Sequence, residues 1–269
     1  MKTLELKQVQ HNTKIGSRCD YIEPNIKDNC ILKVDGEIIG FYINNVAEYS
    51  ERLKTLISIA NKEFNSDNVP KSLLERSDVM QNVYRGGMTR KEAKKHGTVQ
   101  MSTILGSIPP KPHMRRPYPN ISSVHTSKKA KTFIKAMWGT CLEAEQIIKQ
   151  ITPNIYNNQT QLFEDVKEDW RFGNMFTSSI SNYNIAAPFH RDTGNIKGAV
   201  NVIITKRRDS KGGCLNVPDY NATFEQADNS MLVYPAWKNI HGVTPIVATE
   251  KGGYRNSLIF YPLKAFKGI

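Results

Sequence analysis

The chain has 269 residues, of which 39% are hydrophobic, and its 37 Lys and Arg side chains against 25 Asp and Glu give a formal net charge of +12. No apolar run is long enough to cross a bilayer, and the opening residues alternate charged with apolar side chains, unlike a signal peptide, so we expect a soluble intracellular protein. The four cysteines, Cys19, Cys30, Cys141 and Cys214, form no Cys-x-x-Cys pair, which argues against a zinc finger or a thioredoxin-type site. The positive charge favours a polyanion, and nucleic acid is the partner we expect; a basic protein without a defined partner is the alternative.

The first part of the chain predicts a scaffold. Asp35-Gly36 between the β-branched runs of residues 31–43 is a strong hairpin signal. Apolar residues at helical spacing predict amphipathic helices over residues 46–64 and 127–151, and a shorter helix over residues 158–170. We expect residues 1–165 to form an α+β extension packed on a core of residues 166–269, the two together making one structural domain.

Residues 72–125 are rich in proline and in basic side chains. Arg85-Gly86-Gly87-Met88 and the basic run of residues 90–96 precede a second basic stretch, residues 109–119. Proline at this density favours an extended, exposed segment. Arg115 and Arg116 are suited to hold phosphates and Tyr118 to stack on a base, so we take them as candidate substrate-binding residues. The alternative is a loop that wraps the core with its charges in solvent.

Residues 175–261 predict a series of short strands. Gly212-Gly213 begins a turn into one strand, residues 230–234 predict another, and residues 255–261 a third. The basic run of residues 207–212 is expected to be a hairpin loop between two strands, exposed so that it meets a DNA backbone.

The candidate reactive side chains lie within this series. In an extended strand His190 and Asp192 point to the same side, so both can reach one metal ion, and His241 would supply a third ligand. Two histidines and one carboxylate, with the opposite coordination face open, bind non-haem Fe(II) for oxygen activation. A His-x-Asp triplet alone is weak evidence, since a strand histidine is more often structural. Arg255 offers a planar fork to a carboxylate, which would belong to 2-oxoglutarate, and Ser257 can donate a hydroxyl to the same group.

These motifs carry a family resemblance. The chain resembles the double-stranded β-helix core of the Fe(II)/2-oxoglutarate dioxygenases through four motifs in order, His190-x-Asp192, Gly213-x-Leu215, His241-Gly242 and Arg255-x-Ser257. The run from His190 to Asn195, the Gly-Gly strand and the turn Pro218-Asp219-Tyr220 are most similar to the branch of the ten-eleven-translocation methylcytosine dioxygenases and the J-binding-protein thymine dioxygenases. The resemblance covers about the last hundred residues.

The resemblance implies an α+β protein with a C-terminal jelly-roll core and an N-terminal helical and hairpin extension. It implies that His190, Asp192 and His241 are the catalytic metal ligands. It also implies that Arg255 and Ser257 bind 2-oxoglutarate. The cofactor would be a resident Fe(II), at which 2-oxoglutarate and O2 are consumed as co-substrates. Substrate methyl groups would be hydroxylated as 2-oxoglutarate is decarboxylated to succinate.

The resemblance is less direct for the substrate. Asn195 falls where cytosine-oxidising members have an Asn or Asp that contacts the flipped base; a turn residue beside Gly194 is the alternative. Leu263 stands where those enzymes carry a base-contacting His, and the Cys-rich zinc insert of the animal enzymes is missing. For the proximal end of 2-oxoglutarate the candidates are Asn174, Asn182 and Asn184, each of which also suits a turn or an edge strand.

We therefore expect a 2-oxoglutarate-dependent dioxygenase that flips a base out of DNA and oxidises the 5-methyl group of a pyrimidine. Conversion of 5-methylcytosine to 5-hydroxymethylcytosine is favoured because of Asn195. The alternatives are a thymine hydroxylase acting on DNA, a protein side-chain hydroxylase, and a catalytically inert nucleic-acid-binding barrel.

Overall fold

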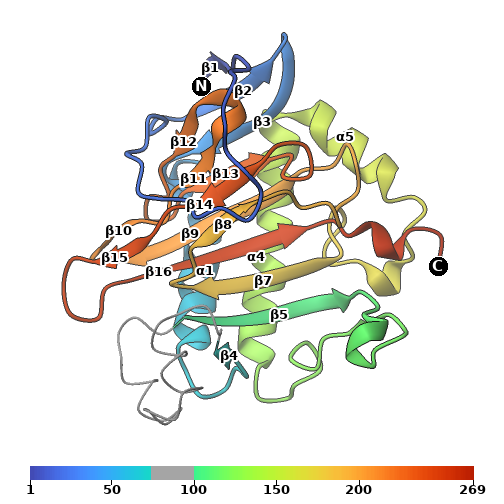
Figure 1. Ribbon diagram of the computed structural model, residues 1–269. Helices are drawn as coiled ribbons and strands as arrows, with labels where there is room; N and C mark the ends of the chain where they lie inside the picture. Colours follow the sequence, from blue (N-terminus) through green and yellow to red (C-terminus); the bar gives the residue numbers. More distant parts are fainter. Residues whose placement is uncertain (74–99) are drawn as a thin grey trace.

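The computed structural model describes residues 1–73 and 100–269, and Figure 1 shows their arrangement. The first basic stretch of the sequence, from Arg85 through His96, lies outside the described residues. No helix of the described part is both long and apolar enough to span a membrane.

A large sheet runs through the molecule, with strand order β1-β2-β3-β13-β9-β16-β7-β5-β4 in the described residues (Figure 1). Only β1 and β2 pair in parallel; the other neighbours are antiparallel. Its strands are β1 (Lys2–Glu5), β2 (Cys30–Val34), β3 (Glu37–Ile43), β4 (Ser72–Leu73), β5 (Met101–Ile108), β7 (Ser178–Tyr183), β9 (Asn201–Arg208), β13 (Met231–Tyr234) and β16 (Tyr254–Tyr261), with β6 (Asn120–Ile121) paired to β5. The strands before residue 165 thus belong to the same sheet as β7, β9, β13 and β16, which come after it.

A second, smaller sheet with order β12-β11-β14-β8 lies over part of the first. It contains β8 (Ala187–His190), β11 (Leu215–Val217), β12 (Ala222–Phe224) and β14 (His241–Val243), while β10 (Ser210–Gly212) and β15 (Ile246–Ala248) form a separate ribbon. From β7 onward the chain passes back and forth between the two sheets, so that β7, β16, β9 and β13 face β8, β14, β11 and β12. This arrangement is the jelly-roll core that the sequence predicts, and the α+β fold class is confirmed.

Alternation along the large sheet divides its side chains between two interiors. On the side away from the second sheet, Val202, Leu258 and Phe260 pack against residues of two helices in the main apolar cluster. On the side toward it, Ile203 and Leu232 pack against Phe224 and other residues of the small sheet. A strand between two apolar layers buries both its faces, and accordingly the first five residues of β9, Asn201 to Thr205, are all buried.

Helices α1 (Glu51–Phe64) and α4 (Lys131–Ile151) cover the outer face of the large sheet, and α5 (Pro153–Leu162) follows α4 (Figure 1). The helix predicted from residue 46 begins later because Ser50 is its N-cap and accepts a hydrogen bond from Leu53 N. The helix predicted over residues 158–170 was misplaced. It begins at Pro153, where the missing N–H of proline is tolerated in the first turn. Short 3-10 turns lie at Val46–Glu48 (η1), Pro112–Met114 (η2), Glu168–Trp170 (η3), Pro218–Tyr220 (η4) and Lys264–Phe266 (η5).

The predicted hairpin of residues 31–43 is confirmed. Asp35 and Gly36 connect β2 to β3 with φ values of 51° and 79°, the left-handed pair of a type I′ turn. Because β3 also pairs with β13, this hairpin extends the large sheet of the core rather than packing separately beside it.

Residues 6–25, here called the N-terminal strap, cross the outside of the small sheet (Figure 1). Gly16 N donates to Phe189 O at 2.7 Å, and Phe189 N donates to Ser17 O at 2.9 Å. Cys19 packs in one cluster with Phe189 and Ile240. The strap therefore pairs with β8, which is an edge strand of the small sheet.

Candidate active site

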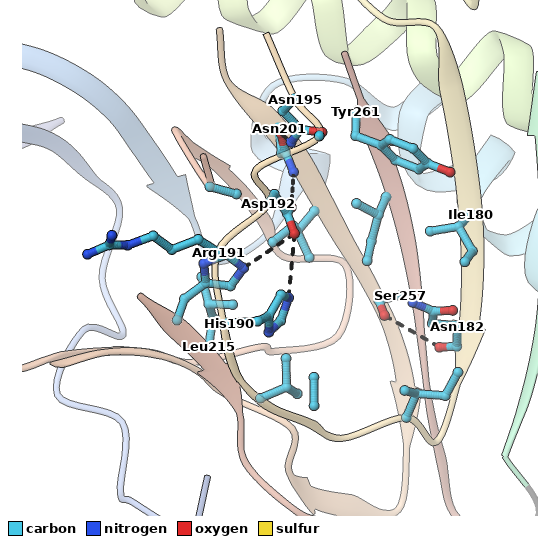
Figure 2. A pocket seen from close by; sticks show the side chains of 18 of the residues that line it. Ile180, Asn182, His190, Arg191, Asp192, Asn195, Asn201, Leu215, Ser257 and Tyr261 are labelled. Atoms are coloured by element: carbon cyan, nitrogen blue, oxygen red, sulfur yellow. Dashed lines mark hydrogen bonds and ion pairs between the residues drawn. The ribbon is translucent and has the colours of Figure 1, made fainter. Parts of the chain in front are cut away.

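A cavity of about 450 Å³ lies between the two sheets (Figure 2). Its walls are largely apolar, formed by Ile180, Ile203, Leu215, Val243 and Ile259 among others. The polar lining is concentrated in two groups, one around His190 and one around Arg255. A mostly apolar cleft with a few convergent polar groups is the usual form of a small-molecule site.

The first group contains His190, Asp192 and His241. His190 is the last residue of β8, His241 is the first residue of β14, and the two are cross-strand partners whose ring centroids lie 4.4 Å apart. Asp192 Oδ1 lies 3.5 Å from His190 Nε2 and 4.0 Å from His241 Nε2 (Figure 2). Asp192 lies two residues beyond the end of β8, so the expectation that it shares a strand with His190 was wrong; the turn nevertheless brings it to the same point. All three ligand atoms lie within 4.8 Å of one another.

Hydrogen bonds fix which nitrogen of each histidine faces the cavity. His190 Nδ1 lies 2.7 Å from Pro188 O, and His241 Nδ1 lies 3.1 Å from Asn239 O. Since a carbonyl oxygen only accepts, each neutral ring carries its hydrogen on Nδ1 and leaves the Nε2 lone pair for a metal. Burial lowers the pKa of His241, which favours this neutral form.

The carboxylate of Asp192 is held in its ionised form. Burial by itself raises the pKa of Asp192, but the two histidines and a hydrogen bond from Asn201 outweigh it, so that the pKa lies below its ordinary value. Two neutral imidazoles and one carboxylate are the donor set that suits Fe(II) and leaves coordination positions open. The residues present therefore fit an iron ion.

The second polar group surrounds Arg255, which is 3% exposed. Its Nε has no hydrogen-bond partner among the described residues, and its Nη2 is 3.4 Å from Gln226 Oε1. Burial and the neighbouring Arg207 lower the pKa of Arg255 to about 10. Gln226 Nε2 is likewise buried without a partner within the described chain. The guanidinium Nε of Arg255 and the amide Nε2 of Gln226, both buried and both without an acceptor among the described residues, fit a carboxylate ligand such as the distal group of 2-oxoglutarate.

Ser257 lies on the same wall as Arg255 because residues two apart on β16 share a face. Its hydroxyl is 3.4 Å from the backbone carbonyl of Asn182, which also lines the cavity (Figure 2). Of the three asparagines considered for the proximal end of 2-oxoglutarate, Asn182 alone lines the cavity. Asn174 instead donates to the buried Glu145, and Asn184 Oδ1 accepts from Arg255 N.

The expected basic hairpin loop of residues 207–212 was wrong at Arg207. This residue lies within β9, on the same face as Ile203, and its guanidinium donates to Gly212 O at 3.1 Å and Gln226 O at 2.9 Å. The turn of the chain is confined to Asp209, with φ of 44°. Strand alternation therefore directs Arg207 inward, directly opposite Arg255 in the register of β9 and β16.

Asn195 lies at the cavity but is 4% exposed, and its backbone forms a bridge with Leu263. Its side-chain amide donates to Asn201 Oδ1 at 2.8 Å. Arg115, Arg116 and Tyr118 do not line the cavity. They lie beside η2 on the segment between β5 and β6, and Tyr118 is 77% exposed.

Sequence reasoning did not find Asn201, Gln226 or the inward orientation of Arg207. Asn201 and Gln226 are single polar residues next to apolar strands, without a motif of their own. Their position at the cavity depends on strand pairing, which the local sequence does not encode. For Arg207 the one available signal is that Ile203, Thr205 and Arg207 lie two residues apart, so that in an extended strand they share a face.

The fold and the two polar groups together define a class. One cavity of the jelly roll contains two histidines and a carboxylate suited to Fe(II), together with a buried arginine that has no carboxylate partner among the described residues. A 2-oxoglutarate-dependent dioxygenase requires this combination, and the chain is an enzyme of this class.

The family follows from the sequence match. Residues 112–264, more than half of the chain, match the model of Tet_JBP, the oxygenase domain of the 2OGFeDO superfamily, and the chain belongs to this family. Its cofactors are accordingly Fe(II), 2-oxoglutarate and O2. No curated protein is significantly similar in sequence.

Solved structures support the fold. NgTET1 in complex with 5mC DNA is 12% identical, with a TM-score of 0.58 over 95% of this chain and 84% of that one. A 2OG-Fe(II) oxygenase family oxidoreductase from Burkholderia pseudomallei is 12% identical, with a TM-score of 0.42 over 82% and 83% of the two chains. A full-length protein of Neurospora crassa in complex with alpha-KG is 12% identical, with a TM-score of 0.39 over 83% and 75%. At this identity the likeness to NgTET1 is one of fold, and the other two overlap too loosely to add to it.

Proposed function

We propose that this enzyme oxidises the 5-methyl group of a pyrimidine in DNA, with 5-methylcytosine converted to 5-hydroxymethylcytosine as the favoured reaction. The observation that carries the proposal is one cavity of about 450 Å³ that joins the three ligand residues to Arg255 in a member of the Tet_JBP family. The similar fold of NgTET1, a protein whose structure contains 5mC DNA, supports the choice of substrate.

In this proposal the cavity is divided by function. His190, Asp192 and His241 hold the iron, while Arg255 and Ser257 bind the distal carboxylate of 2-oxoglutarate. When bound, the iron centre uses O2 and 2-oxoglutarate to place one oxygen atom in a methyl C–H bond and the other in succinate, with release of CO2. The apolar walls position the methyl group and exclude water.

The rim of the cavity carries exposed cations suited to phosphates. Arg191 lines the cavity, and its side chain extends away from the ligand group (Figure 2). Lys264 N donates to Gly194 O at 3.0 Å, which places Lys264 beside the same turn, and Lys197 follows that turn; all three basic side chains are exposed. Phosphate contacts of this kind would position a DNA strand and supply salt-dependent affinity.

Residues 109–119 are a second candidate DNA contact. The hairpin leaves β5 beside the start of β7, where Ser107 N donates to Thr177 O. Thr177 Oγ1 in turn accepts from Leu263 N at the cavity rim. Arg115, Arg116 and Tyr118 therefore extend from the end of the large sheet that bears Leu263, and we propose that they contact DNA outside the cavity.

Thymine in DNA is a second candidate substrate. Leu263 contributes an apolar side chain to the rim, and the amide of Asn195 is already bonded to Asn201. Leu263 has no acceptor for the exocyclic amine of cytosine, the group that distinguishes it from thymine, and Asn195 could accept from that amine only through Oδ1. This observation favours a pocket that accepts either 5-methyl pyrimidine.

The test is an assay with Fe(II) and 2-oxoglutarate on DNA that contains 5-methylcytosine, with unmethylated DNA alongside. The assay is started by admitting oxygen and is read by mass spectrometry of the digested nucleosides. We expect 5-hydroxymethylcytosine that disappears in a His190→Ala variant. 5-Hydroxymethyluracil in both DNAs would transfer the assignment to thymine, and succinate formed without any altered nucleoside would refute a DNA substrate.

A binding experiment tests the rim separately. Neutralising Arg191 and Lys264 with Gln should weaken DNA binding and lower the slope of log K against log salt by about two, one for each lost phosphate contact. The matched control is Lys62→Gln, an exposed lysine on α1, the helix on the far face of the large sheet. Equal effects of the rim and control variants would show that the rim does not contact the DNA.

A further inference from the structure

We infer that Asn201 and Asn195 are positioning residues of the iron centre. Asn201 holds one carboxylate oxygen of Asp192 so that the other faces the two histidines, and Asn195 fixes the orientation of Asn201. The inference rests on the proposed role of Asp192 as a metal ligand and goes beyond it, because it assigns a function to two buried amides that the ligand set does not include.

The contacts form a short relay. Asn201 is the first residue of β9, is 2% exposed, and donates from Nδ2 to Asp192 Oδ2 at 2.9 Å. Its Oδ1 accepts from Asn195 Nδ2 at 2.8 Å. Figure 2 shows Asn195 and Asn201 next to each other, on the side of Asp192 away from His190. Both amides are therefore joined to the carboxylate and shielded from water.

The direction of the relay follows from the charge of Asp192. An ionised carboxylate can only accept hydrogen bonds, so Asn201 must turn its NH2 group toward it. The carbonyl of Asn201 then faces Asn195, which must in turn present its own NH2 group. One orientation of both amides satisfies every contact, so the ionised state of Asp192 fixes the orientation of both asparagines.

Asp192 needs such an anchor because no strand fixes its backbone. It lies in a turn beyond β8, whereas His190 ends β8 and His241 begins β14; the side chains of Asp192 and His190 are 32% and 39% exposed, and that of His241 is 5% exposed. Without a hydrogen bond to Oδ2, the carboxylate is free to rotate and present either oxygen, or both, to a metal. The bond from Asn201 leaves Oδ1 as the ligand atom, at 3.5 Å and 4.0 Å from the two Nε2 atoms. One-atom coordination keeps a further metal position open.

The relay gives Asn195 a role that differs from contact with a flipped base. Asn195 N also donates to Asp192 O at 2.9 Å, so the residue is attached to the ligand turn through both its backbone and its side chain. If Asn195 acts through Asn201, its loss changes metal binding when no DNA is present. If it acts on the base, its loss changes only the interaction with DNA.

The experiment is a titration of the full chain with Mn(II) alone, followed by electron paramagnetic resonance of the free ion, without DNA or 2-oxoglutarate. We expect Asn201→Leu to weaken Mn(II) binding about 10- to 100-fold, the usual effect of losing a partner of a metal ligand. Asn195→Leu should weaken it in the same direction by a smaller factor. The matched control is Asn216→Leu, a buried asparagine of β11 that bonds Thr223 Oγ1 outside the cavity, and it should bind Mn(II) like the wild type.

Thermal unfolding of each variant separates loss of the fold from loss of the relay. If Asn201→Leu does not fold, Asn195→Leu decides the question, because its side chain reaches the ligand only through Asn201. Unchanged Mn(II) affinity in the folded variants would overturn the inference, as would an Asn195→Leu variant that binds Mn(II) normally but DNA poorly. Failure of the wild type to bind Mn(II) would instead refute the metal site itself.

Discussion

Arg255 provides the sharpest test of the site because its charge is buried without an acidic partner. Burial and Arg207 lower the pKa of Arg255 from 12.5 to about 10. At about 1.4 kcal/mol for each pKa unit, this shift means that the charged guanidinium is destabilised by roughly 3 kcal/mol in the free enzyme. A carboxylate bound against it would remove most of that penalty.

We therefore expect opposite effects of Arg255→Met on stability and on binding. Without co-substrate, the variant loses the buried charge and one long hydrogen bond to Gln226, worth about 1 kcal/mol, so it should be about 2 kcal/mol more stable than the wild type. With 2-oxoglutarate, loss of a buried charge-assisted contact costs about 2 to 5 kcal/mol, so the Kd should rise by roughly 30-fold or more.

The assay is thermal unfolding with Mn(II), in the presence and absence of 2-oxoglutarate. The wild type should gain stability from 2-oxoglutarate, and Arg255→Met should begin with a higher Tm and gain little. Arg208→Met is the control, because Arg208 is an exposed arginine of β9 and should leave both quantities unchanged. A variant that is less stable than the wild type, or that retains the full response to 2-oxoglutarate, would refute the reasoning.

Three further predictions address the surroundings of the site. A Cβ at Gly213, whose φ is 69°, would lie 2.5 Å from Arg255 Cδ and displace that side chain, so Gly213→Ala should raise the KM for 2-oxoglutarate by about tenfold. The control is Gly252→Ala, where φ is also positive at 82° but the added Cβ would meet no atom closer than 3.9 Å, and the KM should not change. Burial raises the pKa of Asp219, but hydrogen bonds from Asn239 and His11 outweigh it and hold the pKa below 3.8. The stability that Asp219 adds is therefore present above 3.8 and lost as pH falls through the folded-state pKa, and an Asp219→Asn variant compared by urea unfolding should converge with the wild type in acid. Burial raises the pKa of Cys19 to about 11, so native protein should resist alkylation at mildly alkaline pH and react after denaturation, as mass spectrometry would show; rapid modification of the native thiol would contradict the packing of the strap.

The metal ligand set was the part of the site most accessible from sequence. The order of the motifs along the chain, and the short strands predicted around them, point to His190, Asp192, His241 and Arg255. Strand alternation then places Arg255 and Ser257 on one wall of the cavity. The structure brings the three ligand candidates within reach of one ion, while their role as ligands stays a prediction.

Contacts that depend on strand pairing were not accessible from sequence. Asn201 reaches Asp192 because β9 lies between β13 and β16 in the large sheet, and no local pattern around Asn201 encodes that neighbourhood. The basic run at Arg207 gave a misleading signal for a similar reason. Charge composition suggested a solvated loop, but alternation within β9 turns the guanidinium inward, where backbone carbonyls accept its hydrogen bonds.

The N-terminal strap has a consequence for the behaviour of the molecule in concentrated solution. β8 is the last strand of the small sheet, and an uncovered edge of this kind offers its N–H and C=O groups to strands of other molecules. Gly16 and Ser17 occupy the groups of Phe189 that would otherwise be available, directly before His190. The strap thus protects the strand that carries His190 from intermolecular pairing, and chains in which it detaches would associate through this edge, next to the cavity.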